Sequence, residues 1–305
     1  MKKNFETVSI NPKRIFVLGG AGFIGSHLCR ELLNIGHQVT CVDNLHTGRV
    51  ENIAELLSEK KFSFAKEDVC ELSDYKADII YNLACPASPV HYQSDEIQTI
   101  RTNAIGTLNA LDLAKKNGAI FVQASTSEVY GAPEIHPQTE NYWGNVNPIG
   151  YRACYDEGKR VGETACFSYK RQHGLDVRVA RIFNTYGPRM LENDGRVVSN
   201  FIVQAINGKP MTIYGDGMQT RSFCYVSDTV RALVRMGQVD PIDHPINIGN
   251  PDEYTIKGLA TIIQGMTGAD SRIEYHELPQ DDPKVRKPDI SRAKAILDWE
   301  PKMDN

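Results

Sequence analysis

Two short segments carry side chains whose types and spacing suit hydride transfer. They are the hydroxyl-rich residues 125–131 and the helix-like residues 155–159, in which a tyrosine and a lysine stand four positions apart. Four residues make about one helical turn, so we expect the ammonium to lie beside the phenol. A tyrosine has a pKa of about 10, so it needs a nearby positive charge to act as a base at neutral pH. Thr126 can hydrogen-bond the same substrate oxygen, and Glu128 adds a carboxylate that simple alcohol oxidation does not require.

The N-terminal region predicts a dinucleotide site. Residues 14–18 form an apolar run typical of a buried parallel strand, and they lead into a glycine-rich stretch, residues 19–25. The glycines permit a tight turn and let backbone N–H groups approach a pyrophosphate at a helix N-terminus. A second predicted strand, residues 38–42, ends in Asp43, where an acidic residue is expected to hold the ribose hydroxyls. A carboxylate there repels a 2′-phosphate, so NAD is favoured over NADP.

The residues predicted to contact NAD lie in this turn, at the ends of predicted strands, and on the helix-like segment that carries the tyrosine and the lysine. They are Gly19, Gly22, Phe23, Ile24, Gly25, Asp43, Asn44, Asp68, Val69, Leu83, Ala84, Ala87, Ser125, Tyr155 and Lys159. Two readings stay open for Asp68, which either touches the adenine or lies in a surface loop.

Strands and helices alternate through the first half of the chain, which predicts a Rossmann-type, doubly wound parallel sheet in the α/β class. Ligands bind beyond the carboxyl ends of such strands, and the segments above lie at those ends. Composition changes after residue 183, where polar and basic loops become frequent. We therefore predict an NAD-binding domain over residues 1–183, to which residues 228–250 return. Residues 184–305 form mainly a smaller, interleaved substrate-binding lobe.

Composition excludes several other classes of protein. The chain has 305 residues and a formal net charge of -4, which argues against a nucleic-acid binder. Its seven cysteines are scattered without a Cys-x-x-Cys pair, which indicates reduced thiols and a cytoplasmic location. The histidines show no metal-ligand spacing, so no metal is expected. Residues 1–13 lack the apolar core of a signal peptide, and no run is long enough to span a membrane.

Several arginines stand in the polar loops of the second lobe. Arginine forks match phosphate oxygens, so these side chains either clamp a diphosphate or carry solvated surface charge. We favour the clamp for Arg221 and Arg286. Asn184 either contacts the ligand or caps its loop.

Long strings of this sequence resemble the extended short-chain dehydrogenase/reductase family and, within it, the UDP-glucuronate decarboxylases. The shared strings are residues 87–89, 125–131, 136–138, 144–150, 154–160, 181–190, 194–201, 219–221 and 286–289. Related 4,6-dehydratases usually carry an Asp-Glu pair after the threonine, whereas Ser127 and Glu128 stand here, as in the decarboxylases. The resemblance covers nearly the whole chain beyond residue 13.

The resemblance implies oxidation of a UDP-glucuronate at C4 by NAD, loss of carbon dioxide from the 4-keto acid, and reduction to UDP-xylose. The implied catalytic residues are Thr126, Ser127, Glu128, Tyr155, Lys159 and Arg286. Those implied to bind the UDP-sugar are Pro89, Tyr92, Glu128, Asn184, Arg189, Val198, Tyr214, Arg221 and Arg286. Within this role, Arg286 either holds the diphosphate or assists near the sugar. Glu128 either helps to protonate C5 or orients the carboxylate.

Three other functions stay open at this point. The first is that of a UDP-sugar C4 epimerase, and the second is that of a decarboxylase that releases the 4-keto pentose. The third is that of an NAD-binding regulatory protein without turnover. The complete set of hydroxyl, phenol, lysine and carboxylate groups argues against the last of these. A homodimer is expected from the resemblance.

Overall fold

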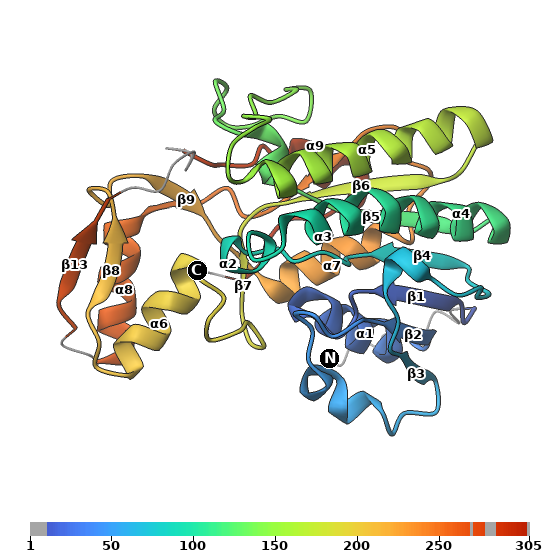
Figure 1. The fold of residues 1–305 in the computed structure, drawn as a ribbon, viewed down its shortest axis with the longest axis horizontal. Helices are drawn as coiled ribbons and strands as arrows, with labels where there is room; N and C mark the ends of the chain where they lie inside the picture. Colours follow the sequence, from blue (N-terminus) through green and yellow to red (C-terminus); the bar gives the residue numbers. More distant parts are fainter. Residues whose placement is uncertain (1–10, 269–270, 278–284, 304–305) are drawn as a thin grey trace, which may run out of the picture.

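The computed structural model describes residues 11–268, 271–277 and 285–303 and divides them between two lobes (Figure 1). The larger lobe surrounds a seven-stranded sheet in the order β11-β6-β5-β4-β1-β2-β3, and each neighbouring pair is parallel. The strands of this sheet are β1 (Arg14–Leu18), β2 (Gln38–Val42), β3 (Phe62–Ala65), β4 (Ile79–Asn82), β5 (Ile120–Thr126), β6 (Val177–Ile182) and β11 (Ile246–Ile248). The predicted α/β class is thus confirmed.

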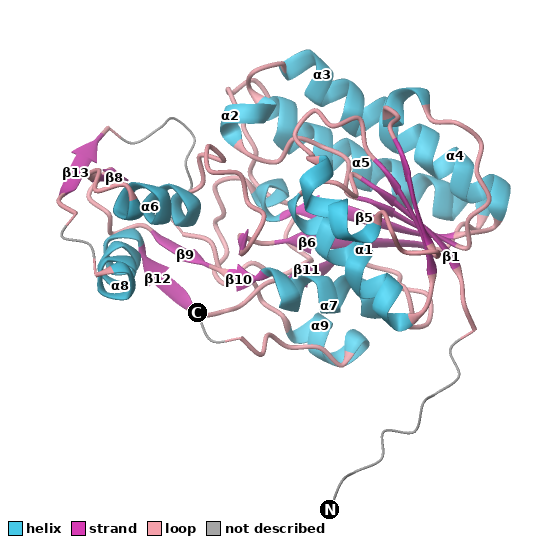
Figure 2. Ribbon diagram, turned by 90° about the horizontal axis from the view of Figure 1, so that it is seen from below, coloured by secondary structure: helices cyan, strands magenta, loops and turns pink. Residues whose placement is uncertain are grey.

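Helices cover both faces of the sheet and enclose two apolar cores. On one face lie α1 (Phe23–Ile35), α7 (Val226–Met236) and α9 (Ser291–Leu297) (Figure 2). These helices share an apolar core with Trp299. On the other face lie α4 (Thr107–Asn117) and α5 (Ala153–His173). Both faces of the strands are therefore buried, which explains their nearly continuous apolar sequences.

Short elements complete the larger lobe and carry the loops around the strand ends. They are η1 (Val50–Leu56), η2 (Val69–Glu71), α2 (Pro89–Tyr92), α3 (Glu96–Arg101), the π-helix η3 (Thr102–Gly106) and η4 (Ser127–Tyr130). The π-helical turn η3 leads directly into α4. No helix in the described part of the chain is long and apolar enough to cross a membrane.

The smaller lobe has its own core between two helices and short strands. Its elements are α6 (Val197–Ile206), β8 (Met211–Tyr214), β9 (Thr220–Ser222), β12 (Glu253–Thr255), α8 (Ile256–Thr267) and β13 (Ile273–His276). Between the lobes, β7 (Thr185–Tyr186) pairs with β10 (Cys224–Tyr225). The chain passes from the large sheet to this lobe after β6 and returns through α7 and β11, so the lobes interleave in sequence.

Candidate active site

A cavity of about 950 Å³ opens at the carboxyl ends of the strands, between the two lobes. Every residue predicted above for NAD, for catalysis and for the UDP-sugar lines this cavity. These residues come from both lobes and span positions 19 to 286. The fold therefore brings the complete predicted set to one place.

The glycine-rich turn after β1 is packed too closely for side chains. A Cβ atom on Gly19 would lie 2.8 Å from the backbone of Leu83 and Ala84, and its φ of +75° also disfavours a side chain. A Cβ atom on Gly25 would lie 2.1 Å from the carbonyl oxygen of Gly19. The turn thus brings its backbone against the next loop and leaves the N-terminal end of α1 open to the cavity, which suits a pyrophosphate.

Asp43 stands at the end of β2, beside this turn. Its carboxylate accepts hydrogen bonds from the backbone N–H groups of Ala21, at 3.0 Å, and Leu45, at 2.8 Å. Burial raises the pKa of Asp43, and these backbone donors oppose that rise. The carboxylate is therefore fixed by the backbone at the position where ribose hydroxyls are expected.

Asp68 belongs to the same end of the cavity. Its carboxylate accepts hydrogen bonds from the Asn44 amide and from the backbone N–H of Cys70, each at 2.8 Å. Asp68 lines the cavity, and its side chain also caps η2. The residue therefore belongs both to the cavity wall and to a loop. The turn, Asp43 and this pair together fit a dinucleotide.

Tyr155 lies in the first turn of α5, where it is buried and lines the cavity. Its ring stacks on that of Tyr92, with centroids 4.9 Å apart. The Lys159 ammonium lies 5.7 Å from the Tyr155 ring centroid and donates to the Ala124 carbonyl at 3.0 Å. Burial raises the pKa of Tyr155, whereas a hydrogen bond with the Thr126 hydroxyl lowers it. The Thr126 hydroxyl on β5 is therefore a hydrogen-bond partner that favours the phenolate form of Tyr155.

Glu128 is held by two guanidinium groups. Arg286 contacts both of its carboxylate oxygens, and the second contact measures 2.8 Å. Arg152, the residue directly before α5, approaches the same carboxylate at 2.8 Å. Burial alone would raise the pKa of Glu128, but the two arginines together hold it at about 2. Glu128 is therefore ionised in this arrangement.

Arg152 is a site residue that the sequence reasoning missed. It stands only three positions before Tyr155, at the N-cap of the same helix, and this proximity was the available signal. Its contact with Glu128 depends on how η4 and α5 pack, which the spacing of the motif does not reveal.

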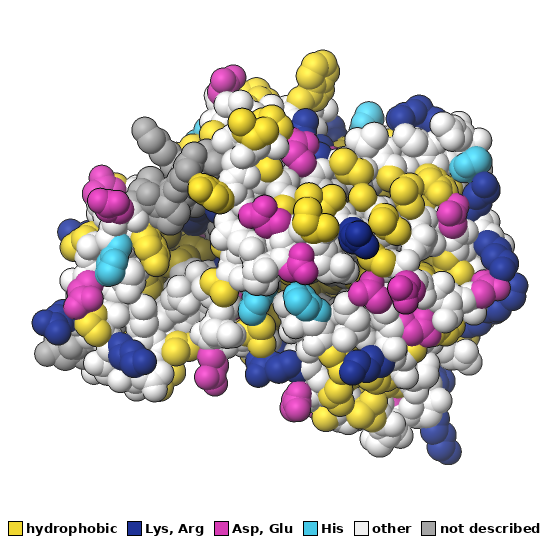
Figure 3. All heavy atoms as spheres, viewed as in Figure 1, with side chains coloured by type: hydrophobic (Ala, Val, Ile, Leu, Met, Phe, Trp, Pro, Cys, Tyr) yellow, Lys and Arg dark blue, Asp and Glu magenta, His cyan; other side chains and the backbone are white. Residues whose placement is uncertain are grey.

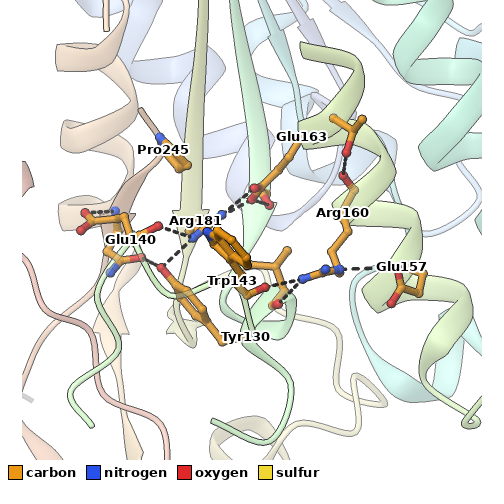
Figure 4. Close-up of polar contacts among 12 residues, drawn as sticks. Tyr130, Glu140, Trp143, Glu157, Arg160, Glu163, Arg181 and Pro245 are labelled. Carbon is orange, nitrogen blue, oxygen red and sulfur yellow. Dashed lines mark hydrogen bonds and ion pairs between the residues drawn. The ribbon is translucent and has the colours of Figure 1, made fainter. Parts of the chain in front are cut away.

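A buried polar network supports the end of β5 from behind (Figure 4). The Ser125 hydroxyl donates to Glu163 at 2.6 Å, and Arg181 binds both oxygens of that carboxylate at 2.9 and 2.7 Å. Arg181 also donates to the Tyr130 hydroxyl at 3.0 Å. This network joins β5, β6 and α5, so it fixes the strand end that carries Thr126.

The predicted sugar-nucleotide contacts lie on the lobe that faces this apparatus. Arg221 is buried on β9 and donates to the Thr220 carbonyl at 2.8 Å. Arg189 has φ +70° and pairs with Glu55 of η1 at 2.5 Å, so it connects the lobes at the cofactor side. The carbonyl of Asn184 accepts from the Cys224 N–H at 2.8 Å, and the residue also lines the cavity.

Sequence comparison agrees with this fold and site. Residues 15–249 match the NAD dependent epimerase/dehydratase family, and the chain belongs to this family. "UDP-glucuronic acid decarboxylase 1" of Xenopus tropicalis is 55% identical over 95% of this chain and 68% of its own length. "UDP-glucuronic acid decarboxylase 6" of Arabidopsis thaliana is 55% identical over 95% of this chain and 84% of its own length.

A solved structure gives a similar picture. The UDP-glucuronic acid 4-epimerase of Bacillus cereus, in complex with UDP-glucuronic acid and NAD, is 30% identical. It superposes with a TM-score of 0.86 over 95% of each chain. The predicted resemblance to extended short-chain dehydrogenases is thus confirmed.

Proposed function

We propose that this protein converts UDP-glucuronate to UDP-xylose with NAD as its cofactor. The observation that carries the proposal is the ion pair of Glu128 with Arg286 in the cavity that also holds Tyr155 and Thr126. Oxidation and reduction at a sugar carbon require only the phenol, the hydroxyl and the lysine. A buried cation beside them suits a substrate that carries a carboxylate. Relatives named for decarboxylation of UDP-glucuronic acid, at 55% identity, support the same assignment.

NAD would be held by the glycine turn and Asp43, and when bound it supplies hydride acceptance and return. Tyr155 accepts the proton of the C4 hydroxyl, and Thr126 hydrogen-bonds the same oxygen. Lys159 favours the phenolate electrostatically. After C4 has become a ketone, Tyr155 and Thr126 stabilise the oxyanion that forms as carbon dioxide leaves. Preorganised donors of this kind are typically worth about 3–4 kcal/mol each. C5 then takes a proton from water, and hydride returns to C4 while Tyr155 gives its proton back to the C4 oxygen.

The ion pair between Glu128 and Arg286 suggests a separate role for each residue. Because Arg286 binds Glu128 rather than a more distant group, we assign Arg286 to the sugar end and not to the diphosphate. Glu128 has a pKa of about 2 in this arrangement, so we assign it the orientation of Arg286 rather than proton donation. Arg221, on the opposite lobe, is the better candidate for the diphosphate.

The test is incubation of the purified protein with UDP-glucuronate, followed by mass spectrometry and absorbance at the NADH band. Loss of carbon dioxide without net NADH is expected. Loss with stoichiometric NADH would mean that the 4-keto pentose is released. A new isomer without mass loss would indicate an epimerase, and no turnover with any UDP-sugar would indicate a binding protein.

The two lobes suggest a division of ligands. We propose that residues 1–183, together with 228–250, bind NAD, and that residues 184–305 mainly bind the UDP-sugar. The pairing of β11 with β6 and the separate core of the smaller lobe support this division. The segment of α9 and Trp299 packs on the larger lobe, so the second unit is not continuous to the C-terminal end.

We also propose a homodimer through the helices on one face of the large sheet. Apolar side chains gather over α3, α4 and α5 on the face drawn in Figure 3. Ile97 is 64% exposed, and Ile105, Leu108 and Val161 are also exposed. Light scattering should give a dimer, and Leu108→Glu should shift it toward the monomer. A monomeric native protein would contradict this proposal.

A cytoplasmic location is proposed on the chemistry of the cysteines. All seven are free thiols, and five of them are buried. Such thiols persist in a reducing compartment. Recovery of the protein with the membrane or organelle fraction would contradict this location.

A further inference from the structure

The sugar end of the cavity contains a carboxylate that bridges two guanidinium groups. Glu128 comes from η4, Arg152 from the N-cap of α5, and Arg286 from the segment before α9. All three residues line the cavity. Side chains from three separate elements thus form a carboxylate-binding fork, which at present holds a carboxylate of the protein itself.

The geometry of the fork suits an incoming carboxylate. Guanidinium groups bind carboxylates through directional, charge-assisted hydrogen bonds, and burial strengthens them. Both arginines are largely buried, with 16% and 5% of their side chains exposed. Both guanidinium groups already bind a carboxylate at the cavity wall, so the fork is built for this chemical group.

Asp156 is a second carboxyl group at this end. It lies one helical turn after Arg152, it is buried, and its Oδ1 has no hydrogen-bond partner among the described residues. Burial and then the charge of Glu128 raise the pKa of Asp156 to about 8, against the opposing effects of Arg152 and Arg286. Asp156 is therefore a much weaker acid than Glu128, so Glu128 is the anion that the two arginines hold.

We propose that Arg152 is a specificity-determining residue that binds the C5 carboxylate of the sugar together with Arg286. Glu128 closes the fork until that carboxylate enters and then gives up its contact with Arg152. This inference rests on the proposed function, because it takes a hexuronate as the substrate.

The experiment compares two ligands that differ only at C6, with and without Arg152. Binding of UDP-glucuronate and of UDP-glucose is measured by calorimetry in the presence of NAD, in a Tyr155→Phe background that prevents turnover. Adding Arg152→Gln should weaken the binding of UDP-glucuronate by roughly 10- to 100-fold, which is the range for the loss of a hydrogen bond to a charged group. The affinity for UDP-glucose should change by no more than about twofold, because Arg152→Gln removes no contact with this ligand.

Two further variants separate binding from folding. Arg152→Lys keeps the charge and should recover part of the affinity for UDP-glucuronate. Arg171→Gln, an arginine exposed near the end of the same helix, serves as the matched control and should leave both affinities unchanged. Thermal melting of each variant reports whether the fold is intact.

The outcomes distinguish this inference from the proposed function. Equal losses for the two ligands in Arg152→Gln, or no loss for either, would overturn the role of Arg152 while leaving the decarboxylase assignment in place. If the Tyr155→Phe variant with Arg152 intact does not bind UDP-glucuronate more tightly than UDP-glucose, the proposed function is overturned, and this inference with it.

Discussion

Glu163→Gln tests whether the network behind β5 depends on a buried charge. The native carboxylate accepts two hydrogen bonds from Arg181 (Figure 4). It also accepts one from the Ser125 hydroxyl. Burial alone would lower the pKa of Arg181, but Glu163 raises it above its ordinary value, so the guanidinium stays charged. The amide keeps the shape of the side chain and removes the negative charge. Arg181 is then left as a buried cation with only neutral acceptors.

The expected loss of stability is large for a single substitution. Removing one partner of a buried ion pair costs about 3–5 kcal/mol, and here each side chain is only 11% exposed. The unfolding entropy is about 2.1 cal/mol/K per residue, or roughly 0.64 kcal/mol/K for a chain of 305 residues. The melting temperature should therefore fall by about 5–8 °C.

Calorimetry at pH 7 provides the assay, and an exposed ion pair provides the control. Asp74→Asn makes the same change from acid to amide in the Lys116–Asp74 pair, whose side chains are 59% and 60% exposed. Solvent screens an exposed pair, so the melting temperature should change much less than in Glu163→Gln. Equal shifts for the two variants would refute the argument that burial of Arg181 decides the effect.

Three other predictions follow from the site. Tyr155→Phe should abolish turnover while NAD binding, measured by calorimetry, is retained; measurable turnover would remove Tyr155 from its role. Gly19→Ala should weaken the binding of NAD at least tenfold, which corresponds to about 1.4 kcal/mol. The reason is that the new Cβ would lie 2.8 Å from the backbone of Ala84. An unchanged dissociation constant would contradict the close packing. Asp156 has a pKa of about 8, above its ordinary value, so the folded state binds more protons than the unfolded state between about pH 4 and pH 8. Stability therefore falls as pH rises through this window, and Asp156→Asn should flatten the decline of the melting temperature; parallel pH profiles would show that Asp156 is ionised throughout.

Much of the cofactor site could be predicted because its signals are local. The glycine turn, the strand before it and Asp43 all lie within one unit of consecutive sequence, and their order already defines the backbone geometry. Likewise, Tyr155 and Lys159 share a helix face through their spacing alone. Alternating apolar strands and helices fixed the parallel sheet, and the carboxyl ends of its strands located the cavity.

The sugar end of the site was decided by tertiary structure. Glu128 and Arg286 are 158 positions apart in sequence, so no periodicity relates them. Their contact arises because the chain returns from the smaller lobe and passes over η4 before it enters α9. Sequence alone left the role of Arg286 open between diphosphate and sugar, and its one signal for Arg152 was the proximity of that residue to Tyr155. Local spacing determines which groups share an element, whereas the packing of distant elements determines which charges meet.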